Sequence, residues 1–160
     1  MTTLAGSIKS IETALDIAIH LEMTGKAFYK NAQAGTTDEK LKKLLTFLVE
    51  QEAVHMERYK QLSERVTGQT VYQEALFGEY SMYIDLLVAD ISGKLVHDAS
   101  LSAKDVINMA LGFEKDTLLF FNELKALFSG KDEEVVDDMC REEKNHIQLL
   151  LSYKRELGEK

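Results

Sequence analysis

Apolar side chains recur along this chain at alternating spacings of three and four residues, which is the period of one face of an α-helix. The first half carries two such stripes, from Ile11 to Ala32 and from Leu41 to Leu62. The second half carries two more, from Ala103 to Phe128 and from Val136 to Leu157. Each stripe predicts one amphipathic helix, roughly 22 to 26 residues and about 33 to 39 Å long.

Polar residues and glycines predict where these helices begin and end, because capping side chains and glycines are common at helix ends. Caps are expected before the second, third and fourth helices, and glycines are expected after the first three. The expected caps are Thr36 with Glu39, Ser102 with Asp105, and Asp132, and the expected stops are Gly35, Gly68 and Gly130.

The connection between the second and third stripes, about residues 69–101, is much longer than the other two. Val71 to Ile91 has a helical pattern, and Gly93 is expected to end that helix. A connection of this length can cross the whole bundle, so the second and third main helices are expected to run parallel. The short turns elsewhere predict two antiparallel hairpins, about residues 10–65 and 103–157.

These elements predict an all-α fold, a four-helix bundle of two antiparallel hairpins joined by a long crossover that contains an extra helix. The 160 residues contain no proline. That absence suits long helices, because proline removes a backbone donor and clashes inside a helix. At this length we expect one domain over residues 1–160, with a substantial core.

Six acidic or histidine side chains occupy places in the stripes where the pattern calls for an apolar residue. The second and fourth stripes each contain a Glu-x-x-His tetrad, and the first and third each contain a lone glutamate. Residues three apart share a helix face, so the two side chains of a tetrad can serve one site. A single tetrad is weak evidence, but here the arrangement occurs twice. The six residues are Glu22, Glu52, His55, Glu114, Glu143 and His146.

Four carboxylates in one apolar core are strongly unfavourable, since burial disfavours each charge and the charges repel one another. Two divalent cations would cancel the charge of all four. Carboxylate with imidazole suits iron or manganese, and a donor set without thiolate argues against iron–sulfur and cysteine-rich zinc sites. The alternative, that these side chains are exposed or cap helices, requires the stripes to be wrongly assigned in all four helices.

Charge and cysteine content exclude several classes of protein. The net charge is −8 and the pI is about 5.0, without a cluster of Lys and Arg, so we expect no nucleic-acid partner. Cys140 is the one cysteine, so no intramolecular disulfide can form. The N-terminus lacks a basic stretch followed by an apolar one, and no apolar run has the length of a membrane span. We therefore expect a cytoplasmic protein that does not associate with membranes.

Four short motifs resemble the rubrerythrin branch of the ferritin-like superfamily. They are Leu21-Glu22-x2-Gly25-x2-Phe28-Tyr29, Glu52-x2-His55, Phe113-Glu114-Lys115-Asp116 and Glu142-Glu143-x2-His146. The resemblance covers both hairpins and, more weakly, the middle of the chain. It implies a ferritin-like fold that holds two iron ions per chain, with manganese or a mixed pair as alternatives.

The resemblance also implies a role for each of the six residues. Glu52 and Glu143 would bridge the two metals. Glu22 with His55 would complete one metal position, and Glu114 with His146 would complete the other.

The function implied by the resemblance is a di-iron oxidoreductase that reduces hydrogen peroxide or dioxygen in defence against oxidative stress. Rubrerythrins usually carry an extra glutamate where this chain has Thr117, which puts in question the ligand exchange thought to support their peroxidase cycle. One cysteine cannot build their four-cysteine iron site. Electrons are therefore expected from a separate donor, such as a rubredoxin or a small reductant.

Two other functions are open on the same scaffold. One is a ferroxidase or iron-storage protein, and the other is a structural bundle whose metal site is vestigial. A homodimer is expected from the resemblance. Its candidate surface is the set of aromatic residues in the crossover, Tyr72, Phe77, Tyr80 and Tyr83.

Several residues beside the six have two possible roles. Tyr29, two turns after the first glutamate, is either a hydrogen-bond donor or redox-active group near one metal, or a core tyrosine. Tyr59 and Cys140 are expected to be packing residues. Gly25 and Thr117 follow the two lone glutamates at the same distance, and they either leave room for O2 or peroxide or allow close helix packing.

Overall fold

The computed structural model describes residues 11–66, 74–95, 98 and 100–158, without the side chains of 11, 74–81 and 84. In this part of the chain there are helices and no strand. The helices are α1 (Ile11–Gly35), α2 (Glu39–Val66), α3 (Glu74–Lys94), α4 (Ala103–Lys125) and α5 (Gly130–Gly158).

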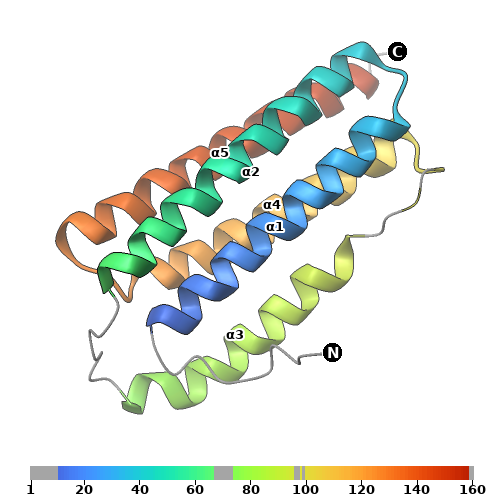
Figure 1. Cartoon of the computed structure of the whole chain (residues 1–160). Coiled ribbons are helices and arrows are strands. Elements are labelled where there is room, and N and C mark those ends of the chain that lie inside the picture. Colours follow the sequence, from blue (N-terminus) through green and yellow to red (C-terminus); the bar gives the residue numbers. More distant parts are fainter. Residues whose placement is uncertain (1–10, 67–73, 96–97, 99, 159–160) are drawn as a thin grey trace.

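Four of these helices form the bundle, as Figure 1 shows. α1 and α2 are an antiparallel hairpin, α4 and α5 are a second, and each pair is in close contact along its length. α2 and α4 run in the same direction, while α3 crosses the length of the bundle on its outside and contacts α4 and α1. The predicted all-α bundle of two hairpins with a helical crossover is therefore confirmed.

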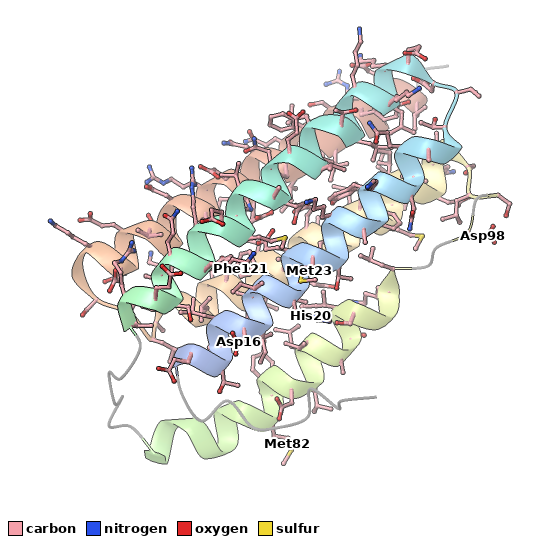
Figure 2. All side chains as sticks on the ribbon, viewed as in Figure 1. Asp16, His20, Met23, Met82, Asp98 and Phe121 are labelled. Carbon is pink, nitrogen blue, oxygen red and sulfur yellow. The ribbon has the colours of Figure 1, made fainter. Side chains whose placement is uncertain are left out.

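The core follows the apolar stripes. On α2 the buried positions repeat every three or four residues, and they run without a break into the acidic and histidine positions. The same holds for α4 and α5. Phe121, for example, is fully buried inside the bundle, whereas Met82 on the outer helix α3 points away from it and is 67% exposed (Figure 2). Within the described residues, no helix has both the length and the hydropathy needed to cross a membrane.

The predicted cap of α2 is wrong by two residues. Oδ1 of Asp38 accepts hydrogen bonds from the backbone N–H groups of Lys40 (2.9 Å) and Leu41 (3.0 Å), so Asp38 satisfies the free donors of the first turn. Thr36 Oγ1 instead accepts from the backbone N–H of Asp38 (3.2 Å). The other oxygen of Asp38 accepts from the hydroxyl of Tyr153 on α5 (2.9 Å).

The boundary between α4 and α5 also differs from the prediction. α4 ends at Lys125, and Gly130, expected to stop that helix, is the first residue of α5. Its φ of +59° is a left-handed conformation that glycine adopts without strain. Asp132 therefore lies within the first turn of α5 instead of capping it. α3 ends at Lys94, one residue after Gly93, so the predicted end of this helix is confirmed to within one residue.

Some expectations fall outside the described residues. The proposed stop at Gly68, the start of the crossover helix at Val71 and the proposed dimer residue Tyr72 belong there. The side chains of Phe77 and Tyr80 are also not described. Tyr83 is 44% exposed, and the dimer stays a prediction.

The predicted capping box of α4 is confirmed. The hydroxyl of Ser102 accepts from the backbone N–H of Asp105 (3.2 Å), and the carboxylate of Asp105 accepts from the backbone N–H of Ser102 (3.1 Å). Each side chain thus satisfies a backbone donor that the helix itself leaves free.

Replacing the serine of this box tests its contribution to stability. Ser102→Ala removes the acceptor for the first turn and is expected to lower the free energy of unfolding by about 1 kcal/mol. Urea denaturation of the metal-free protein, followed by circular dichroism, measures the change. Ser152→Ala, an exposed change within α5, is the control and should alter stability by no more than about 0.5 kcal/mol. Equal effects of the two changes would contradict the assignment.

Candidate metal centre

The six predicted side chains converge inside the bundle. Each of the four bundle helices supplies one glutamate, and α2 and α5 each add a histidine from the following turn. All six are at most 1% exposed. They are Glu22 on α1, Glu52 and His55 on α2, Glu114 on α4, and Glu143 and His146 on α5.

Their donor atoms form two overlapping groups, within each of which the atoms lie within 4.8 Å of one another. One group consists of Glu22, Glu52, His55 and Glu143, and the other of Glu52, Glu114, Glu143 and His146. Glu52 and Glu143 belong to both groups. The side chains thus have the arrangement that two neighbouring metals with two shared carboxylates require.

Both imidazoles turn Nδ1 toward the carboxylates. His55 Nδ1 lies 2.7 Å from Glu143 Oε1 and 3.4 Å from Glu22 Oε2. His146 Nδ1 lies 3.2 Å from Glu143 Oε2 and 3.6 Å from Glu114 Oε2. The two rings stack with centroids 5.5 Å apart. Glu143 therefore lies against both histidines, between the two halves of the cluster.

The cluster leaves buried polar atoms without hydrogen bonds, which is costly unless another group satisfies them. The atoms that lack a partner among the described residues are Glu22 Oε1 and Oε2, Glu52 Oε1, His55 Nδ1, Glu114 Oε2, Glu143 Oε1 and His146 Nε2. His55 Nδ1 is close to a carboxylate but not in hydrogen-bond geometry. Carboxylate oxygens and imidazole nitrogens of this kind suit a pair of divalent transition metals, whose charge would balance the four carboxylates.

Without metal, protons must carry part of this charge balance. Burial and the neighbouring charge of Glu143 raise the pKa of Glu114 to about 8, and burial, then the charge of Glu22, raises the pKa of Glu52. Burial lowers the pKa of His146, but contacts with Glu114 and Glu143 outweigh it and raise that pKa to about 10. Burial acts to raise the pKa of Glu143, but its contacts with both histidines lower it well below the usual value.

Tyr29 contacts the cluster from the opposite hairpin. Its buried hydroxyl donates a hydrogen bond to Glu114 Oε1. Tyr29 therefore contacts the cluster glutamate of α4 and not Glu22 on its own helix. The corresponding place on α4 holds Phe121, which has no hydroxyl and packs against Tyr59 with centroids 5.1 Å apart. Tyr59, expected to be a packing residue, is fully buried, and its hydroxyl has no hydrogen-bond partner among the described residues.

The space beside Gly25 is filled by neighbouring side chains. A Cβ there would lie 2.6 Å from a ring carbon of Phe113 and 3.0 Å from Glu52 Oε2. Close packing against Phe113 and Glu52 therefore accounts for this glycine. Thr117, at the equivalent place on α4, is buried, and its hydroxyl has no partner in the described structure. Cys140 is buried, and burial raises the pKa of its thiol to about 11.

One contact of the site was missed from the sequence. Glu142 Oε2 lies 2.7 Å from His55 Nε2, and its other oxygen accepts from Arg58 at 2.7 Å. The hydrogen bond from His55, opposed by burial and reinforced by Arg58, lowers the pKa of Glu142 to about 2. The signal in the sequence was a second glutamate directly before Glu143, which helix periodicity places near the rim of the buried face.

Comparison with known proteins fits this site. A family model described as Rubrerythrin matches residues 13–157, nearly the whole chain. The chain belongs to the rubrerythrin family. No curated protein sequence matches it significantly.

A crystal structure described as a putative ferritin-like diiron-carboxylate protein from Thermotoga maritima resembles this rubrerythrin-family chain with a TM-score of 0.69. The two are 24% identical, and the match covers 91% of this chain and 95% of the other. That likeness supports the ferritin-like fold. Family membership and the buried Glu and His cluster together support a di-metal site of the carboxylate type.

Metal content after single substitutions tests which ligands are shared. Glu52→Ala removes a side chain common to both groups and is expected to abolish binding of both metals, whereas Glu22→Ala should leave about one ion per chain. Elemental analysis of protein loaded with Fe²⁺ under anaerobic conditions measures both. Glu64→Gln, an exposed change on α2, should retain the full content. Retention of one metal by Glu52→Ala would show that it does not bridge.

The raised pKa values predict how stability of the metal-free protein depends on pH. Glu114 and His146 bind protons more tightly in the folded protein than in the unfolded chain. Their contribution to the free energy of unfolding is therefore present at low pH and is lost as pH rises. This stabilisation is lost between about pH 4.5 and 8 for Glu114 and between about pH 6.5 and 10 for His146. The urea midpoint in EDTA should therefore fall between pH 6.5 and 8.

The metal-loaded protein is the control for this pH experiment. Because bound metal replaces the protons on the ligands, its midpoint should not fall over the same range. A midpoint of the metal-free protein that rises from pH 6.5 to 8 would contradict the assigned directions.

Proposed function

We propose that this protein is a di-iron oxidoreductase that reduces hydrogen peroxide or dioxygen with electrons from a separate donor. The observation that supports it best is the pair of donor groups sharing Glu52 and Glu143, completely enclosed in the bundle. Membership of the rubrerythrin family supports iron as the metal and redox chemistry as the activity.

The donor atoms favour a redox-active metal. Each position would receive carboxylates and one imidazole, a combination that suits iron or manganese. The cluster contains no thiolate, since the one cysteine, Cys140, belongs to neither donor group. When bound, a pair of iron ions would supply the two electrons that reduction of an O–O bond requires.

The protein's own residues prepare the site for that reaction. Reduction of one hydrogen peroxide consumes two electrons and two protons and yields two waters. Burial of every ligand keeps bulk water from the site, which strengthens the electrostatic interactions within it. The hydroxyl of Tyr29 donates a hydrogen bond to Glu114 Oε1 and thereby holds this carboxylate in one orientation. The opposite oxygen of Glu114 stays available to a metal.

The source of electrons lies outside the cluster. The sequence contains one cysteine, so these 160 residues do not hold the four-cysteine iron site that could deliver electrons within the chain. We therefore propose that a separate protein, such as a rubredoxin, or a small reductant restores the reduced state. With Thr117 in place of an extra carboxylate, α1 and α4 each supply one glutamate to the cluster, Glu22 and Glu114.

Rapid mixing of the anaerobic Fe²⁺-loaded protein with each oxidant tests the function. We expect oxidation of bound iron at least about tenfold faster than that of free Fe²⁺, because the buried ligands hold both ions beside the oxidant. One hydrogen peroxide should oxidise about two bound iron ions. Stopped-flow absorbance with equal concentrations of H2O2 and O2 measures the preference between oxidants.

Two controls accompany this experiment. Glu52→Ala should oxidise iron no faster than the free ion, and Glu64→Gln should behave like the unmodified protein. No acceleration with either oxidant would refute the proposed oxidoreductase. Uptake of iron far beyond about two ions per chain would instead identify a storage protein.

A further inference from the structure

The two halves of the metal centre carry the same ligands but different supporting residues. The chain repeats its pattern so that Glu143 and His146 on α5 correspond to Glu52 and His55 on α2. In this correspondence Glu142 matches Gln51, so the residue before the shared glutamate is charged in one half and neutral in the other.

The supporting contact of His55 is a charged one that crosses between the hairpins. Its Nε2 lies 2.7 Å from Glu142 Oε2 on α5. Arg58, one turn after His55 on α2, donates to Glu142 Oε1 at 2.7 Å and holds that carboxylate in place. A carboxylate at Nε2 keeps the proton on that nitrogen, so the lone pair of Nδ1 is directed at the carboxylate cluster.

Among the described residues, none makes such a contact with Nε2 of His146. Its Nε2 is buried and has no hydrogen-bond partner in the described part of the chain. Its ring meets the edge of Phe47, with centroids 6.1 Å apart and planes at 86°. The place of Arg58 is taken in the repeat by Leu149, which is apolar and 42% exposed. Among the described residues, then, none fixes the tautomer of His146 as Glu142 fixes that of His55.

The lone glutamates of the two halves, Glu22 and Glu114, also differ in how many of their oxygens are available to a metal. Both oxygens of Glu22 lack a hydrogen-bond partner among the residues described, so both are available to one metal. Glu114 has one oxygen engaged by the hydroxyl of Tyr29 and only Oε2 without a partner there. A donor on a ligating carboxylate also withdraws electron density from it. The half with Glu22 and His55 thus offers more free donor atoms and the more basic imidazole.

We infer that the two metal positions are unequal, with the position of Glu22 and His55 binding its ion more tightly, and that Glu142 is the positioning residue responsible. This inference rests on the di-metal site of the proposed function but not on its redox chemistry. It concerns equilibrium binding, so a metal that does not react with oxygen can test it.

Titration of the metal-free protein with Co²⁺ measures the two steps, because the visible absorption of Co²⁺ reports the ligands around it. We expect two successive steps separated by at least about tenfold in affinity. Glu22→Gln should remove the tighter step, and Glu114→Gln should remove the weaker one. Two equal steps in the unmodified protein, or loss of the tighter step in Glu114→Gln, would overturn the inference.

Substitution of the positioning residue provides the second test. Glu142→Gln should weaken the tighter step by about 10- to 100-fold and alter its absorption, while changing the weaker step much less. Glu64→Gln changes the net charge equally on an exposed face of α2 and should leave both steps unchanged. Glu142→Asp, which keeps the charge, should restore part of the lost affinity.

The remaining outcomes are also decisive. Circular dichroism of the metal-free variants shows whether each has folded, and Glu142→Asp serves as the variant if Glu142→Gln has not. Equal weakening of both steps, or no weakening, would show that Glu142 does not act through His55. If the protein binds Co²⁺ in two unequal steps but oxidises iron slowly, only the proposed redox function is refuted. If it does not bind Co²⁺, the di-metal site itself is refuted.

Discussion

The burial of four carboxylates inside one helical bundle is the constraint on which the rest of this structure depends. Glutamate in an apolar interior is unstable as an anion unless a cation or a proton compensates it. Here the helices bring the four to a common depth, where each is at most 1% exposed. The apolar residues above and below them form the core that holds this arrangement, so folding and metal binding are coupled.

Internal repetition explains why the site can hold two metals, and departures from it explain why they need not behave alike. Each hairpin contributes two glutamates and a histidine from equivalent positions. The residues that touch these ligands are not repeated. Tyr29 is matched by Phe121, Glu142 by Gln51, and Gly25 by Thr117. Contacts around the ligands, more than the ligands themselves, distinguish the two positions.

The sequence was sufficient for the fold and for the convergence of the six side chains, because helix periodicity alone decides which residues face inward. It was less reliable at helix ends. Thr36 and Asp38 both suit a cap, and the choice depends on the path of the chain between α1 and α2. Glu142 was missed because its importance arises from His55 and Arg58 on another helix. Spacing within one helix does not reveal such a contact between hairpins.

The bond between Tyr153 and Asp38 has a consequence for how the protein unfolds. Asp38 immediately precedes α2, while Tyr153 lies in the last turns of α5, far away in the sequence. If the end of α5 detaches from the bundle, the residue that caps the first turn of α2 loses this hydrogen bond. Local unfolding at the end of α5 would therefore remove one side-chain restraint from the start of α2 and so couple the stability of these two distant segments.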